Sequence, residues 1–276
     1  MMYETNFHKA ATVRDAAALL VKSDDGKILA GGQTLIPTMK QRLAAPVDLI
    51  DLSRVAALRG VTIAKRKKMG IMKANGGETI TIGAMTTHAE VAADEELAKV
   101  CPVICRLAGN IGDPAVRHRG TIGGSVANND PAADYPAALL ALDATIHTDT
   151  REIAAADYFK GMFLTALNDD EIVVAVSFEA PAVGGYGKFP NPASRYAMAG
   201  VFVAKSVGGE VRVAVTGAGE NGVYRQADLE AALSVDWSVA SVDGVAVSSD
   251  GLMSDLHGNA TYRANLIKVM AKRALV

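Results

Sequence analysis

Two segments with paired glycines carry the clearest chemical signal in the sequence. Residues 30–35 read AGGQTL, and residues 120–125 read GTIGGS. Paired glycines let the backbone approach a ligand closely and expose consecutive N–H groups, which form a concavity suited to phosphate oxygens. Each segment alone is a weak signal, because any tight turn can use two glycines. Together they suggest a diphosphate that is held from two sides.

A third glycine pattern satisfies the dinucleotide-binding fingerprint GxGxxG in an unsuitable setting. Gly217, Gly219 and Gly222 follow an apolar run, but residues 223–225 stand between the motif and the next plausible helix. In the true fingerprint the helix opens inside the motif, so that its N-terminus meets the pyrophosphate. We therefore expect a glycine-rich turn at this position.

The cysteines and histidines do not form a recognisable metal or cluster site. Cys101 and Cys105 lie four residues apart in an apolar stretch, where a helix would place both on one face, and we expect buried, reduced thiols. A [2Fe–2S] cluster normally takes four protein ligands. With two thiols and five scattered histidines, the chain is predicted to carry no cluster and no metal of its own.

Charge and hydropathy exclude two classes of function. The chain has 276 residues, and its 28 basic and 30 acidic side chains leave a net charge of −2, which offers no footprint for nucleic acid. No apolar run approaches the roughly 18 residues that a membrane span requires. The basic run KRKK at residues 65–68 is predicted to be a solvated turn beside an edge strand. The first residues show no apolar signal region, so we expect a cytoplasmic protein.

The elements that must position the glycine segments alternate between helix and strand. Thr12 and Asp15 form a capping-box pattern. Apolar periodicity then predicts helices over residues 13–22, 34–42, 87–93, 94–107, 137–142 and near 157–163, and strands over residues 27–30, 47–52, 144–148, 151–155 and 171–181. A hairpin or meander is expected around residues 60–86, and a long polar loop over residues 109–136, where chemistry is most expected.

The last third of the chain has a different pattern. Residues 184–195, GGYGKFPNPASR, have the composition of a connection between domains. Two antiparallel strands are predicted over residues 196–207 and 209–219, followed by helices at 226–233 and 259–275. These elements predict a second, smaller domain.

The segments AGGQTL and TIGGS, with the continuation NNDPAADYPAALLAL, resemble the FAD-binding medium subunit of aerobic carbon monoxide dehydrogenase and its relatives in the molybdenum hydroxylase (xanthine dehydrogenase) family. The resemblance covers nearly the whole chain. It implies an α+β fold with a two-lobed FAD-binding domain of the vanillyl-alcohol-oxidase type over residues 1–176, with lobes of about 1–54 and 55–176. A smaller α+β C-terminal flavoprotein domain over residues 177–276 would follow.

The resemblance also implies a set of FAD-binding residues. One side of the diphosphate would be held by Lys27, Leu29, Ala30, Gly31, Gly32, Gln33, Thr34 and Leu35, and the other by Gly120, Thr121, Gly123, Gly124 and Ser125. Asn128 and Asp134 would contact cofactor hydroxyls, Ala108 and Val173 would lie near the rings, and Lys188 near the flavin. Tyr196 is a candidate for stacking on the ring.

Three positions depart from many relatives, which read AGGHS and TIGGN where this chain has Gln33, Thr34 and Ser125. These polar replacements leave the backbone donors intact. Residues 27–35 contain no His or Cys, and the second segment has only His118 nearby, so non-covalent FAD is predicted.

The function implied by the resemblance is electron transfer within a complex. A large molybdenum-cofactor subunit would oxidise the substrate, a small [2Fe–2S] subunit would relay electrons, and this chain would pass them through FAD to quinone, NAD⁺ or oxygen. The chain would then be an oxidoreductase subunit in a hetero-oligomer, with no catalytic residue of its own. Two alternatives stay open: a free-standing FAD-dependent NAD(P)H reductase on the same fold, and a scaffold that has lost flavin.

Overall fold

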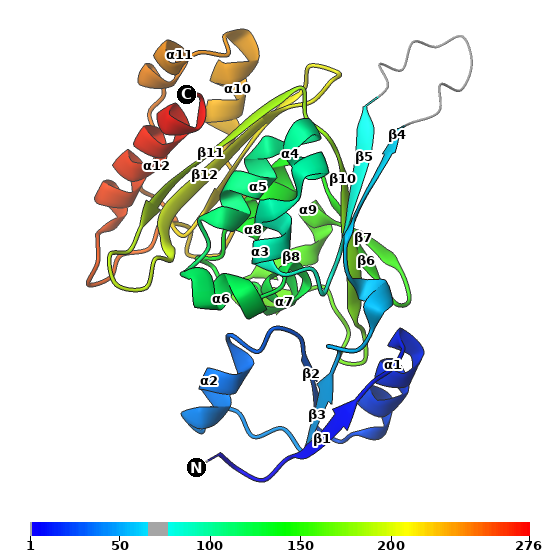
Figure 1. Cartoon of the computed structure of the whole chain (residues 1–276). Helices are drawn as coiled ribbons and strands as arrows, with labels where there is room; N and C mark the ends of the chain where they lie inside the picture. The colour runs from blue at the N-terminus through cyan, green and yellow to red at the C-terminus, as the bar shows by residue number, and fades with distance from the viewer. Residues whose placement is uncertain (1, 66–76) are drawn as a thin grey trace.

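The N-terminal lobe is a small parallel sheet flanked by two helices. The computed structural model describes residues 2–65 and 77–276. In this lobe the strands follow the order β1-β3-β2, and both pairs are parallel. Its elements are β1 (Asn6–Lys9), α1 (Val13–Lys22), β2 (Gly26–Leu29), α2 (Leu35–Lys40) and β3 (Asp48–Asp51), drawn in blue in Figure 1. The predicted helix over residues 13–22 is confirmed, because Thr12 and Asp15 form the expected capping box.

The second lobe is built on an antiparallel sheet. A short 3₁₀ helix, Ala56–Leu58, leads into it. Among the described residues its strands follow the order β4-β5-β10-β6-β7. They are β4 (Val61–Lys65), β5 (Glu78–Gly83), β6 (Thr145–Thr148), β7 (Glu152–Ala154) and β10 (Val173–Glu179). The predicted hairpin is thus present as β4 and β5, while residues 66–68 of the KRKK run lie outside the described residues.

The helices of the second lobe surround an apolar core against this sheet (Figure 1). They are α3 (His88–Ala93), α4 (Glu95–Val100), α5 (Pro102–Gly109), α6 (Pro114–Arg119), α7 (Ile122–Asn128), α8 (Tyr135–Ala141) and α9 (Ala155–Tyr158). A small hairpin of β8 (Phe159–Gly161) and β9 (Leu164–Thr165) follows α9. The helix predicted over residues 94–107 is interrupted at Cys101, and Pro102 starts a new helix there.

The long polar loop predicted over residues 109–136 is wrong, because two short helices form inside it. Asp113 accepts a hydrogen bond from Val116 N at the start of α6, and Thr121 accepts one from Gly124 N at the start of α7. Both are standard N-caps. The glycines concealed the helix because glycine normally disfavours helix interiors. The helix predicted near residues 157–163 is also misplaced: α9 begins and ends earlier, at Ala155 and Tyr158, and β8 follows directly.

The C-terminal domain packs helices on an antiparallel sheet. In the described chain the strands follow the order β11-β12-β13-β14. Its elements are β11 (Val183–Pro190), β12 (Ala197–Lys205), β13 (Val211–Thr216), β14 (Tyr224–Arg225), α10 (Ala227–Val235), α11 (Val239–Asp243) and α12 (Ala260–Ala274). Both predicted strands and both predicted helices of this part are confirmed, and α12 lies across the sheet (Figure 1).

The prediction that residues 184–195 connect two domains is wrong, since most of them form β11. The glycines of this strand allow α12 to approach. A Cβ atom on Gly185 would lie 1.6 Å from the Ala274 carbonyl oxygen, and one on Gly187 would lie 2.2 Å from the Met270 carbonyl oxygen. Glycine here serves close packing of a helix on a strand rather than a turn.

The glycine-rich turn after β13 and the two cysteines both agree with the sequence-based predictions. Gly217 and Gly222 have φ angles of +79° and +85° in the turn after β13, and no helix opens before Ala227, so the glycine-rich turn is confirmed. Cys101 and Cys105 are free and buried, as predicted.

None of the helices in the described residues is long and apolar enough to cross a membrane. The domain boundary expected between residues 176 and 177 falls inside β10 (Val173–Glu179), so we propose that it lies after this strand.

Candidate FAD-binding site

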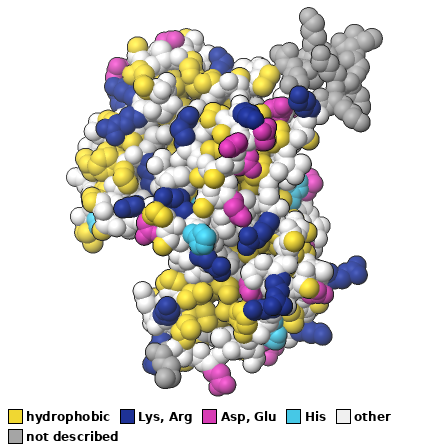
Figure 2. Space-filling model, viewed as in Figure 1, with side chains coloured by type: hydrophobic (Ala, Val, Ile, Leu, Met, Phe, Trp, Pro, Cys, Tyr) yellow, Lys and Arg dark blue, Asp and Glu magenta, His cyan; other side chains and the backbone are white. Residues whose placement is uncertain are grey.

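A cavity of about 510 Å³ lies between the N-terminal lobe and the rest of the molecule. Residues 27–35 line it from the N-terminal lobe, and Gly120, Thr121 and residues 123–125 line it from the second lobe. Residues 194–196 contribute from the C-terminal domain. Apolar side chains gather on the N-terminal lobe, at the bottom of Figure 2, where it meets the larger part of the molecule. All three parts of the fold therefore contribute to the lining of the cavity.

The N-terminal side of the cavity presents unused backbone donors. The segment between β2 and α2 turns sharply at Gly32, whose φ of +72° favours glycine. Across the described residues, the N–H groups of Gly31, Gly32, Gln33 and Thr34 make no hydrogen bond. Such a run of free N–H groups suits phosphate oxygens.

The opposite side of the cavity presents a close backbone surface whose glycine N–H groups are occupied. Gly120 N donates to the Val116 carbonyl at 2.7 Å, and Gly123 N donates to the Ala84 carbonyl at 2.9 Å. Gly124 N donates to Thr121 Oγ1 at 3.1 Å. The glycines on this side accordingly let a ligand approach the backbone closely, and they contribute few free N–H donors.

The two glycine segments meet at one end of the cavity. A Cβ atom on Gly31 would lie 2.2 Å from the Arg119 carbonyl oxygen and 2.7 Å from Gly120 Cα. A Cβ atom on Gly124 would lie 3.4 Å from Ala30 Cβ. Any side chain at Gly31 would fill the space between the two segments. A cradle of bare backbone with free donors on one side fits the diphosphate of FAD.

A buried ion pair joins the cavity to the C-terminal domain. Lys188 Nζ lies 2.9 Å from Asp134 Oδ2 and donates to the Asn110 carbonyl at 3.2 Å. Tyr186 also donates to Asp134 Oδ1. Burial raises the pKa of Asp134, although Lys188 and Tyr186 oppose this effect. The positive charge of Lys188 is therefore paired with Asp134.

The structure brings together most of the residues that the sequence singled out. Sixteen of the eighteen line the cavity: Lys27, Leu29, Ala30, Gly31, Gly32, Gln33, Thr34, Leu35, Gly120, Thr121, Gly123, Gly124, Ser125, Asn128, Asp134 and Val173. Lys188 is not among the lining residues, but its Nζ contacts Asp134, which is. Ala108 is fully buried in the apolar core and does not line the cavity. Tyr196, the stacking candidate, does line it.

Several lining residues were not found from the sequence. His88 packs against Gly120, and burial together with Arg117 lowers the pKa of its imidazole to about 4. Arg195 lies at the cavity with a left-handed φ of +62°. Glu171 lines the cavity from the segment before β10. A histidine or carboxylate without a recognisable motif becomes visible only when tertiary packing brings it to the site.

This two-lobed α+β fold, with a bare-backbone cradle between its lobes, defines a flavin-nucleotide-binding protein. The family model described as "FAD binding domain in molybdopterin dehydrogenase" matches residues 3–180. The chain belongs to this family, which confirms the resemblance drawn from the glycine segments. Its cofactor is FAD, and it is a flavoprotein oxidoreductase subunit. In the described residues no group of three or more His, Cys, Asp and Glu side chains could hold a metal ion.

Two relatives and one solved structure match along nearly the whole chain. The nicotine 6-hydroxylase medium subunit of Paenarthrobacter nicotinovorans is 34% identical over 280 residues, covering 96% of this chain and 94% of that protein. The carbon monoxide dehydrogenase medium chain of Hydrogenophaga pseudoflava is 31% identical, with 98% and 95% covered. A solved structure of carbon monoxide dehydrogenase from Hydrogenophaga pseudoflava that lacks the Mo-pyranopterin moiety matches with a TM-score of 0.84 and 32% identity, over 100% of this chain and 97% of that chain.

Proposed function

We propose that this protein is the electron-transfer subunit of a molybdenum hydroxylase complex. A large molybdenum-cofactor subunit would supply electrons to a [2Fe–2S] subunit. This chain would receive the electrons from that subunit and pass them to an external acceptor. The observation that carries the proposal is the contact between Gly31 and Gly120, which would let the two lobes form one cradle for FAD. The relatives support the assembly, because their names describe medium subunits of larger enzymes.

The residues of this chain would bind and enclose the cofactor. The free N–H groups of residues 31–34 would donate to the diphosphate, while Gly120 and Gly124 would let it approach the second lobe. Asp134, held by Lys188 and Tyr186, would orient a cofactor hydroxyl. FAD, when bound, supplies the exchange between one-electron and two-electron steps, and the protein supplies position and electrostatics. We also infer a cytoplasmic setting, which two buried, free cysteines favour.

Co-purification tests the proposal. The chain is tagged in its native cell, and the eluate is assayed for flavin, iron and molybdenum together. We expect all three in constant ratio. Flavin alone, together with NAD(P)H oxidation by the isolated chain, would favour the free-standing reductase instead. A chain that stays colourless after reconstitution with FAD would favour the scaffold.

A further inference from the structure

The segment between β9 and β10 links the two sides of the cavity. We call residues 167–173 the wall segment, because Leu167, Glu171, Ile172 and Val173 line the cavity. Although the wall segment belongs to the second lobe, Ile172 is 3% exposed and packs in the apolar core of the N-terminal lobe with Ile50 and other residues. The spacing of the two lobes therefore depends on where the wall segment is held.

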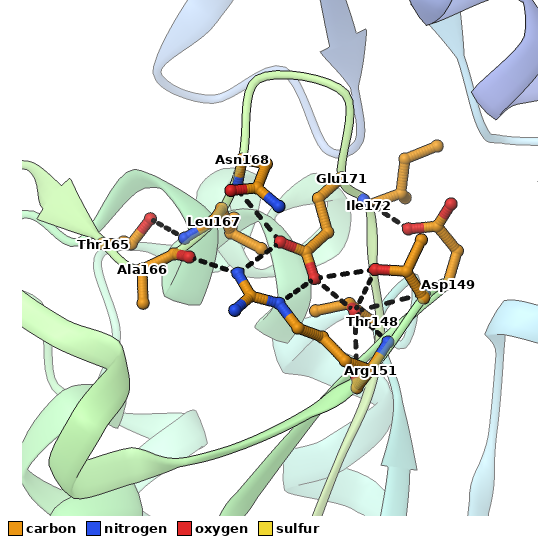
Figure 3. Close-up of polar contacts among 10 residues, drawn as sticks. Thr148, Asp149, Arg151, Thr165, Ala166, Leu167, Asn168, Glu171 and Ile172 are labelled. Carbon is orange, nitrogen blue, oxygen red and sulfur yellow. Dashed lines mark hydrogen bonds and ion pairs between the residues drawn. The ribbon is translucent and has the colours of Figure 1, made fainter.

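The Glu171 carboxylate is the centre of the contacts that hold the wall segment (Figure 3). Arg151 donates to it twice, from Nε to Oε1 and from Nη2 to Oε2, both at 2.8 Å. Thr148 and Thr150 donate to Oε1 at 2.6 and 3.0 Å, and the Asn168 backbone N–H donates to Oε2 at 3.0 Å. The Glu171 side chain is only 1% exposed, so its negative charge is stabilised by these protein groups rather than by solvent.

The turn between β6 and β7 is also bonded to Ile172 in the wall segment and to Ala166, the residue just before it. Arg151 Nη2 also donates to the Ala166 carbonyl at 2.6 Å. Ile172 N donates to Asp149 Oδ1 at 2.8 Å, and Asp149 N donates to the Ile172 carbonyl at 3.0 Å (Figure 3). Arg151 lowers the pKa of Glu171 to about 2, so the carboxylate is ionised at neutral pH. The wall segment is thus held before any cofactor binds.

We propose that Glu171 is a positioning residue for FAD: through Arg151 and Asn168 its carboxylate holds the wall segment against the N-terminal lobe and fixes the width of the cavity. The inference rests on the proposed function, because it takes FAD as the occupant of this cavity. A wall that is already ordered removes part of the entropy cost of binding. Loosening it weakens FAD binding even though Glu171 acts through its neighbours.

Two variants and one matched control isolate this role. Glu171→Gln replaces one carboxylate oxygen by an NH₂ group, so that Asn168 N–H and Arg151 compete for one oxygen. Arg151→Lys keeps the charge but loses the planar two-donor geometry. The control is Glu230→Gln in the C-terminal domain, where Arg225 donates to Glu230 in the same two-point manner, at 2.7 and 2.9 Å. Glu230 does not line the cavity.

The test measures the FAD dissociation constant of the full chain by flavin fluorescence, below the melting temperature of every variant. We expect Glu171→Gln to weaken binding at least about tenfold, Arg151→Lys less, and Glu230→Gln within about twofold. Lower fluorescence anisotropy of the flavin bound to Glu171→Gln is also expected. An unchanged constant in Glu171→Gln, or equal weakening in Glu230→Gln, would overturn the role of Glu171.

Two further outcomes are equally decisive. If Glu171→Gln does not fold, Arg151→Lys takes its place, and an unchanged constant in that variant overturns the inference. If the wild-type chain takes up no FAD, the proposed function itself fails. Wild-type uptake with unaffected variants removes only the positioning role, so the two failures are distinguishable.

Discussion

The glycine segments on the two sides of the proposed FAD cavity look alike in sequence but differ in their hydrogen bonds. In the N-terminal lobe, the N–H groups of residues 31–34 have no hydrogen-bond partner in the part of the chain that the structure describes. In the second lobe, those of Gly120, Gly123 and Gly124 are bonded within the protein. A pair of adjacent glycines therefore supplies N–H donors on one side of the cavity. On the other side, a similar pair supplies only a backbone surface that a ligand can approach closely. Glycine marks close approach in both places, but the donors follow from the local secondary structure.

The largest effect is expected at Gly31, where the two sides meet. In Gly31→Val the new side chain would occupy the space next to the Arg119 carbonyl, since even its Cβ atom would lie 2.2 Å from that oxygen. We expect FAD binding to fall below detection, because the lobes are forced apart. Visible absorbance after reconstitution measures it. Gly208→Val, in a turn with no atom closer than 3.6 Å to its Cβ position, is the control. A yellow Gly31→Val protein would contradict the cradle.

A second variant tests whether the second-lobe side of the cavity, unlike the N-terminal side, is packed tightly enough for a substitution to lower folding stability. Gly123 lies in α7, and a Cβ atom there would lie 2.4 Å from Ala84 Cβ and 2.7 Å from its carbonyl oxygen. Because this contact is inside the second lobe, Gly123→Val is expected to cost about 3 kcal/mol of folding free energy as well as FAD binding. Denaturant unfolding of the apoprotein measures the cost. Loss of FAD with unchanged stability would show that the second side is not a packed surface.

The pH dependence of folding offers a third test of the second side. His88 packs against Gly120, and its pKa is lowered to about 4 from 6.5 by burial and by Arg117. The unfolded chain therefore binds the proton first, and the free energy of unfolding should fall as the pH falls from about 6.5 to 4, by up to about 3 kcal/mol. Below that range the folded state also takes the proton, and the His88 contribution levels off.

The measurement compares the slope of stability against pH in the wild type with that in His88→Phe, which keeps an aromatic ring but cannot bind a proton. The difference between the two curves removes the titration of carboxylates that both proteins share. We expect the wild type to be steeper between pH 6.5 and 4. Parallel curves would mean that His88 titrates normally and is not enclosed behind Gly120.

Much of the cradle could be predicted from sequence, because glycine pairs are legible without tertiary context. Residues 184–195 show the opposite case. Their glycines resemble a linker, yet most of these residues form β11, because the α12 residues that the glycines contact, Met270 and Ala274, lie more than 80 residues later in the chain. Glu171 was missed for the same reason. Its meaning depends on Arg151 and on contacts of the wall segment with the N-terminal lobe, neither of which leaves a local pattern.

The smallest effect is expected at Gly124, where one added methyl group should change FAD binding and folding stability in different directions. Gly124 lies in α7, where alanine is the better helix former by about 1 kcal/mol. Its Cβ position lies 3.0 Å from Thr121 Oγ1 and 3.4 Å from Ala30 Cβ, so Gly124→Ala projects a methyl group toward the opposite side of the cradle. We expect an unchanged or slightly higher melting temperature, but FAD binding weaker by a few fold. Calorimetry and fluorescence titration measure the two quantities separately. If binding tightened together with stability, Gly124 would not border the place where the diphosphate lies.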